Sequence, residues 1–165
     1  VLKRRFKFLT QDESRYDQSS YSTTKKLKLC GDEISPSELL TVFSNVDLPF
    51  EMTTKFRKHF QSFPPLSLHC QEHYPNGDIF LGERNPQGQR QGFGLYIHHC
   101  SSIFLGQWDQ NKRSGFGLYL YQIGELYCGQ WQNDIKHGQG IYRYNNGDLY
   151  KGQFHNDQLD GQGSY

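Results

Sequence analysis

Residues 127–148 read YCGQWQNDIKHGQGIYRYNNGD, and this stretch decides the fold. Its first five residues alternate aromatic residues or glycine with variable residues, which is the two-residue period of a β-strand. Residues 138–144 alternate in the same way and predict a returning strand. Asn146-Gly147 is expected to supply the positive backbone angles of a tight turn into the next unit. The stretch therefore predicts one antiparallel hairpin and its link to another.

The same pattern recurs with a period of 23 to 24 residues, in units that begin at Phe80, Phe104, Tyr127 and Tyr150. Tandem hairpins predict a mainly β fold, an elongated single-layer antiparallel sheet. Glycine weakens a strand interior, so the glycines that recur in phase are expected to leave room for aromatic rings. These structural glycines are Gly82, Gly92, Gly94, Gly106, Gly115, Gly117, Gly129, Gly138, Gly140, Gly152, Gly161 and Gly163.

Aromatic residues occupy equivalent positions in successive units, and stacking the units predicts a continuous aromatic layer on one face. Packing is the expected role of most of these rings, because a single-layer repeat has no other core. The rings least needed for packing are the candidate partner-contact residues. They are Trp108, Tyr119, Trp131, Tyr142, Tyr144 and Phe154.

The opposite face is expected to change along the array. In the first two units it is apolar, with Phe93, Leu95, Ile97, Phe116, Leu118 and Leu120. In the last two units the matching positions are mostly polar. Contiguous apolar patches generally mark a covered surface, so helices from the preceding segment, or else a partner protein, should cover this one. The covering side chains are expected to be Leu39, Leu40, Phe43, Phe56, Phe60 and Phe63.

The composition divides the chain near Tyr74, since fifteen of the seventeen glycines lie after residue 80. Residues 1–34 are predicted to form an irregular basic and polar arm, residues 35–65 two short helices, and residues 74–165 the repeat array with a truncated last unit. A capping Ser35 followed by Pro36 predicts the start of the first helix.

Phenylalanines at steps of four and three predict the second helix, from about Pro49 to Ser62. The basic residues beside them would also fit an amphipathic membrane helix, but a docked apolar face is favoured. The basic start of the chain, Lys3 to Lys7, is either solvated or contacts an acidic neighbour such as tubulin or RNA, and both possibilities stay open.

These units resemble the membrane occupation and recognition nexus (MORN) repeat, whose pattern is Tyr-x-Gly-x-Trp, a loop, Gly-x-Gly-x-Tyr and then Asn-Gly-Asp. The resemblance covers residues 74–165. Unit one departs from it, because Arg84 replaces the second aromatic residue, its loop is longer, and residues 99–102 replace Asn-Gly-Asp. Residues 74–78 resemble the tail of a preceding, degenerate unit.

The resemblance implies a non-catalytic scaffold in a large cytoskeletal assembly, with a ciliary or flagellar axoneme of the radial-spoke type as the expected setting. The aromatic groove would hold a helix or extended segment of another protein, or a second MORN array. Two alternatives remain: a peripheral phospholipid-binding module, or a targeting module for an enzyme whose catalytic domain lies outside this chain.

Charge and motifs exclude other classes of function. The formal net charge is +1 and residues 80–165 balance at zero, which disfavours nucleic acid and anionic lipid as partners. The absence of a signal-like segment and of paired cysteines favours an intracellular protein. No catalytic or nucleotide-binding motif occurs, so no enzyme activity and no cofactor are predicted. Residues 98–100 read His-His-Cys but fit no common spacing of metal ligands, so no metal site is predicted.

Overall fold

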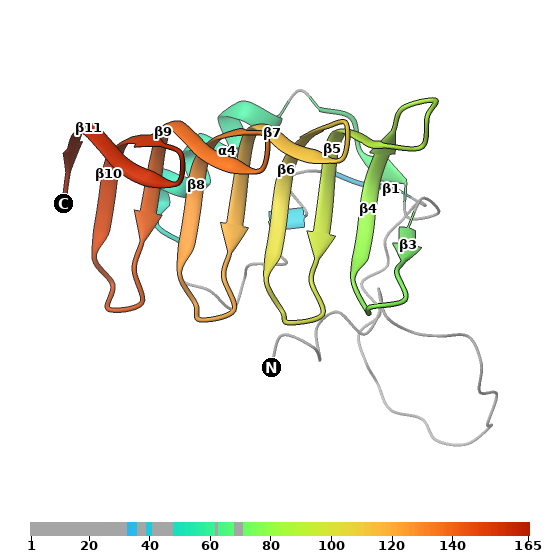
Figure 1. Ribbon diagram of the computed structural model, residues 1–165, viewed down its shortest axis with the longest axis horizontal. Helices are drawn as coiled ribbons and strands as arrows, with labels where there is room; N and C mark the ends of the chain where they lie inside the picture. The colour runs from blue at the N-terminus through green and yellow to red at the C-terminus, as the bar shows by residue number, and fades with distance from the viewer. Residues whose placement is uncertain (1–32, 36–38, 41–47, 62, 68–70) are drawn as a thin grey trace, which may run out of the picture.

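The structure is a computed structural model, and it describes residues 33–35, 39–40, 48–61, 63–67 and 71–165. Within these residues, nine strands form one antiparallel sheet in which strands consecutive in sequence are neighbours (Figure 1). The predicted mainly β fold of tandem hairpins is confirmed. The strands are β3 (Gln71–His73), β4 (Ile79–Arg84), β5 (Arg90–Ile97), β6 (Ile103–Asp109), β7 (Lys112–Leu120), β8 (Leu126–Gln132), β9 (Ile135–Arg143), β10 (Leu149–His155) and β11 (Gln158–Ser164).

Three further elements precede the sheet. A short antiparallel pair joins β1 (Glu33–Ile34) to β2 (Leu66–Ser67), and helix α4 (Phe50–Phe60) lies between them in the sequence. Of the first predicted helix, the structure describes one helical hydrogen bond, in which the Leu39 N–H donates to the Ser35 carbonyl at 3.0 Å. Phe43 and the predicted basic arm at residues 3–7 lie outside the described residues.

Two kinds of turn connect the strands, and the tighter kind is not where the sequence predicted it. In units two to four, a two-residue turn with positive φ at both central positions lies inside the unit, as at Asn133 and Asp134, with φ of 50° and 69°. In the turn between units only Gly147 has positive φ, so the prediction for Asn146 is wrong. The loop there has three residues, and in such a loop only the last must adopt the left-handed conformation.

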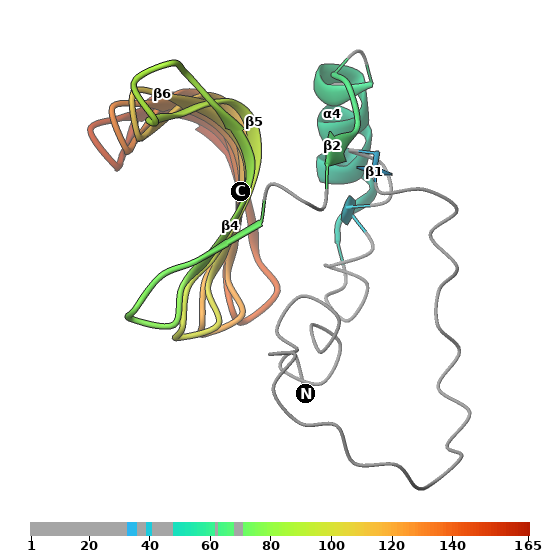
Figure 2. The ribbon, with the colours of Figure 1, turned by 90° about the vertical axis from the view of Figure 1, so that its right-hand side faces the viewer.

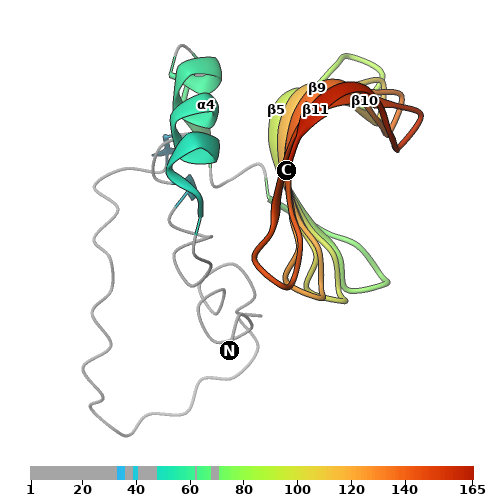
Figure 3. The same ribbon diagram turned by 90° about the vertical axis from the view of Figure 1, so that its left-hand side faces the viewer.

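Seen along its length, the sheet is bent into a trough (Figures 2 and 3). Helix α4 lies outside this trough, on its convex side. The concave side carries no other element among the described residues. Because neighbouring residues of a strand point to opposite faces, each strand gives one set of side chains to the convex core and the other to the concave face.

The convex face and α4 share one hydrophobic core. The ring of Phe60 lies 4.8 Å from that of Phe93 and 5.8 Å from that of Phe116. The His59 ring stacks on Phe116 with a centroid distance of 3.9 Å. All six apolar residues named for this face are buried, and so are Leu39, Leu40, Phe56 and Phe60 from the segment that precedes the sheet. Phe63 packs against this core and is partly buried.

The helix reaches further along the array than the sequence indicated. Cys128 and Ile141 of the third unit belong to the same buried core. The Cys128 thiol donates to the carbonyl of Met52 at 3.7 Å, and Glu51 pairs with Lys151 of the fourth unit. Met52 lies one helical turn before Phe56, on the same face of α4, and extends the covered area toward β8.

Candidate functional site

The concave face is built around a row of aromatic rings that crosses the sheet. Strand pairing places one ring of each strand directly opposite one ring of the next, from β4 to β10. The row consists of Phe80, Tyr96, Phe104, Tyr119, Tyr127, Tyr142 and Tyr150. Trp108, Trp131 and Phe154 pack edge-on against these rings. The aromatic layer predicted from the repeat is therefore one connected cluster.

A row of paired glycines runs beside the rings and makes room for them. Gly106 pairs with Gly117, and a Cβ atom at Gly117 would lie 2.5 Å from two carbons of the Phe104 ring. The same relation holds in the third unit, where a Cβ at Gly140 would lie 2.5 Å from the Tyr127 ring. Each ring, at residue i, lies over the glycine at i+2 on its own strand and over the partner of that glycine on the next strand.

The other glycines of the Gly-x-Gly pairs have a different role. Gly115 has a φ of 77°, a conformation that side chains other than glycine rarely adopt, and the adjoining strand pairing is irregular there. The side-chain amide of Gln107 lies over it and accepts a hydrogen bond from the Phe116 N–H at 2.7 Å. Gln130 repeats this contact in the next unit. These bulges therefore increase the local twist of the sheet, while the glutamine side chains pair the backbone N–H groups of Phe116 and Gln139.

A cation from each of three units lies over the aromatic layer. The Arg90 guanidinium lies 4.5 Å from the Trp108 ring centroid, and that of Arg113 lies 4.4 Å from Trp131. Lys136 lies 5.5 Å from Tyr121. A cation over an aromatic face is stabilised by the ring quadrupole. The concave face therefore combines apolar rings with fixed positive charges.

Tyrosine hydroxyl groups add hydrogen-bonding capacity along the same face. Burial, together with a hydrogen bond to Glu125, raises the pKa of Tyr142. Burial and the bond to Asp78 raise the pKa of Tyr96 to about 12. These hydroxyls are therefore neutral donors at physiological pH.

This geometry has a counterpart among protein families. The MORN repeat family model matches residues 104–125, 127–149 and 150–165. Residues 104–165 therefore form three consecutive MORN repeats. No curated protein matches the chain in a sequence comparison. MORN repeats are generally non-catalytic, and they indicate a module that binds proteins or membrane lipid.

The family matches begin at Phe104, so they leave out unit one of the MORN array, which departs from the pattern at Arg84. Its strands nevertheless pair in the same register, with Gly82 opposite Gly94. The degenerate tail before it also has the repeat's turn, since the Tyr74 N–H donates to the Asp78 carbonyl at 2.9 Å. The MORN sheet therefore extends beyond the matched residues.

The six predicted partner-contact residues divide into two groups. Trp108, Trp131 and Phe154 are only 6 %, 5 % and 3 % exposed, because neighbouring rings of the MORN array cover them. The premise that they are little needed for packing is wrong for these three. Tyr119, Tyr142 and Tyr144 are half-buried and present part of their rings to the groove. The side chains that sequence reasoning missed are the cations, whose phase in the MORN repeat was visible but not used.

The turn at residues 98–102 is organised by a buried carboxylate. Asp78 is 5 % exposed and accepts hydrogen bonds from the Tyr96 hydroxyl at 2.8 Å and the His99 N–H at 2.8 Å. Burial alone would raise the pKa of Asp78, but these bonds and those from the His99 and Asn76 side chains outweigh it and hold the pKa well below its ordinary value. Among the described residues, no cluster of three or more potential metal ligands is present. No helix among them has the length and apolarity needed to cross a membrane.

Proposed function

We propose that the chain is a non-catalytic scaffold module whose concave groove holds a segment of another protein. One observation carries this proposal: among the described residues, one face of the sheet is covered by another element and the other face is not. The convex face is closed by α4, whereas the concave face presents half-buried tyrosines and cations with no described segment over them. An aromatic and cationic trough of this kind suits a helix or extended segment, which can be read by ring contacts and by charge.

A large cytoskeletal assembly is the proposed setting, with the ciliary or flagellar axoneme as the location. This setting rests on the resemblance of the repeat to those of radial-spoke proteins, and resemblance is a weaker argument than the geometry of the groove. It is tested by expressing the chain as a fluorescent fusion in ciliated cells. Enrichment in the axoneme supports the location, and uniform distribution refutes it.

Site-directed photo-crosslinking tests the groove itself. A photo-reactive residue replaces Tyr144, and the chain is exposed to cell extract and, separately, to phosphatidylserine vesicles. The same substitution is then combined with Tyr119→Ser and Tyr142→Ser, which remove two half-buried rings. The matched control is Phe50→Ser, because Phe50 is 86 % exposed and lies on α4, outside the groove.

We expect crosslinks to defined proteins that the double tyrosine variant loses and the Phe50 variant keeps. Crosslinks to lipid alone would replace the scaffold function with membrane binding, which the zero net charge of residues 80–165 disfavours. Protein crosslinks that persist unchanged in the double tyrosine variant would refute the groove as the binding site.

A further inference from the structure

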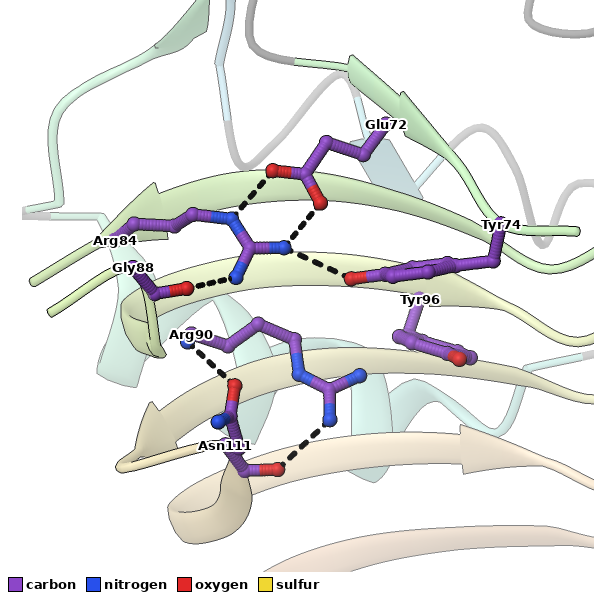
Figure 4. Close-up of a pocket in the computed structure, with 7 residues that line it drawn as sticks. All are labelled: Glu72, Tyr74, Arg84, Gly88, Arg90, Tyr96 and Asn111. Carbon is purple, nitrogen blue, oxygen red and sulfur yellow. Dashed lines mark hydrogen bonds and ion pairs between the residues drawn. The ribbon is translucent and has the colours of Figure 1, made fainter.

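The concave groove ends beside unit one in an open pocket of about 650 Å³ (Figure 4). It is lined by two arginines, two tyrosines, one carboxylate and one amide: Arg84, Arg90, Tyr74, Tyr96, Glu72 and Asn111. Arg84 stands where the other units have a tryptophan or phenylalanine. The pocket therefore lies at the position where this unit departs from the repeat.

Arg84 is fully engaged within the chain. Its Nε donates to Glu72 at 2.5 Å, and one terminal nitrogen donates both to Glu72 and to the Tyr74 hydroxyl, at 2.8 Å for the latter. The other terminal nitrogen donates to the Gly88 carbonyl. The bidentate pair with Glu72 neutralises the charge of Arg84, so Arg84 lines the pocket without being free to bind a ligand.

Arg90 differs from the equivalent cations of the next two units. Arg113 meets a carboxylate of the following turn, with its Nε 3.0 Å from the Asp134 side chain. Lys136 meets another at the same place in its unit, 3.5 Å from Asp157. The repeat thus pairs each of these cations with an acid at the second position of the next two-residue turn.

For Arg90 that position is Asn111, which carries no charge. Asn111 still accepts a hydrogen bond from the Arg90 backbone N–H at 2.8 Å, and its carbonyl accepts one from the guanidinium at 3.0 Å. The Nε of Arg90 is buried and has no hydrogen-bond partner in the described part of the chain. A buried donor without a partner is unfavourable, and Arg90 has only aromatic ring faces where Arg113 and Lys136 also have a carboxylate.

We propose that this pocket binds the carboxylate side chain of an acidic residue in an extended protein segment lying along the groove. The proposal deepens the scaffold function and rests on it. The pocket holds two guanidinium groups and one carboxylate, a net charge of +1, which one carboxylate neutralises. A guanidinium and a carboxylate match in shape and form short, charge-assisted hydrogen bonds. A phosphate carries more charge than the pocket can balance, and Glu72 would repel it.

Two single substitutions test the pairing without disturbing the fold. Asn111→Asp gives Arg90 the internal carboxylate that the other units have, and should close the site. Asp134→Asn removes that carboxylate from Arg113, and should open a second site. Both residue types already occupy this turn position elsewhere in the chain, at φ of 67° to 70°, so neither change strains the backbone.

Binding is measured on the full 165-residue chain, labelled with ¹⁵N, from the NMR signals of the arginine Nε–H groups. The probes are N-acetylglutamate N-methylamide, its glutamine counterpart, and inorganic phosphate. We expect the glutamate probe to shift the Arg90 signal and to bind at least about tenfold more tightly than the glutamine probe, as a charged hydrogen bond implies. Asn111→Asp should abolish this shift, and Asp134→Asn should add one at Arg113.

Equal shifts from the glutamate and glutamine probes, no shift from either, or an unchanged response in Asn111→Asp would overturn the proposal. Tighter binding of phosphate than of the glutamate probe would also overturn it. Its failure differs from failure of the scaffold function. If crosslinking finds a partner segment but the Arg90 signal does not respond to carboxylates, the groove remains the proposed binding site and the proposal that its pocket binds an acidic side chain is refuted. If Arg90 binds the glutamate probe but no segment crosslinks, the acidic segment and the scaffold function fall together.

Discussion

The two faces of the sheet obey different rules. On the concave face the same residue types recur in all units except at Arg84, and the glycine pair Gly106–Gly117 has counterparts from β4 to β11. On the convex face the residues drift from apolar to polar, from Leu95 in β5 to Ile141 in β9 and Lys151 in β10. The concave face is packed by the sheet's own rings, whereas the convex face is packed by α4.

The difference shows what a repeat specifies and what it leaves free. A ring that lies over a glycine pair needs those residues in every unit, because each ring contacts its neighbours in the units on both sides. A face covered by a helix needs apolar residues only as far as the helix extends. Substitutions on the two faces should therefore have different effects on stability.

The largest effect is expected from Phe60→Ala on the convex side. Phe60 is fully buried between α4 and the sheet, so the change should lower the free energy of unfolding by about 3 to 5 kcal/mol. Denaturant unfolding measures it. Phe50→Ala, on the exposed side of the same helix, is the control and should change stability by less than about 0.5 kcal/mol. Equal losses in the two variants would show that α4 does not close the convex core.

A smaller loss, of about 3 kcal/mol at most, is expected from Gly117→Ala on the concave side, because the new Cβ would overlap the Phe104 ring. The matched experiment repeats the substitution in a Phe104→Leu background, where the smaller side chain leaves room. The loss should then shrink, as expected for two residues in direct contact. Losses that add independently would contradict the packing of rings over the glycine row.

A pH-dependent effect is expected at the first turn, where Asp78 is buried while the equivalent Asp148 is exposed. Asp78→Asn should destabilise the fold by about 1 to 2 kcal/mol at pH 7, whereas Asp148→Asn should have little effect. The pKa of Asp78 is lowered in the folded protein, so its stabilisation is present above the unfolded-state pKa of about 4 and is lost as the pH falls below it. Unfolding midpoints of the variant and the native chain are compared at pH 7 and at pH 3. The difference between the two proteins should be smaller at pH 3.

The smallest effect is expected from Lys151→Ala, which removes the ion pair with Glu51 at the far end of the helix. Both side chains are exposed, so the loss should lie below about 1 kcal/mol and decrease with added salt. Thermal unfolding at low and high salt measures it. A large, salt-independent loss would mean that the contact of α4 with unit four is more than an exposed ion pair.

The sequence predicted the hairpins, the phase of the units and the face of each ring, because these depend on spacing alone. It placed α4 correctly from the steps between Phe56 and Phe60, but it did not show that Met52 would cover Cys128. The burial of Trp108 and Trp131 could not be predicted from the sequence either, because it depends on how far rings of successive strands overlap. The orphaned Nε of Arg90 depends on a contact between residues 21 positions apart, which no local pattern displays.

The two-residue turns do more than reverse the chain. The N–H groups of Asn111, Asp134 and Asp157 each donate to the carbonyl of the preceding unit's cation residue, at 3.0 to 3.1 Å. Units two, three and four are therefore each hydrogen-bonded to the unit before them at the rim of the sheet as well as through their strands. Strong coupling between nearest neighbours makes isolated loss of an internal unit unfavourable. Under mechanical load or heat, the units at the two ends of the described sheet should unfold before the internal units do.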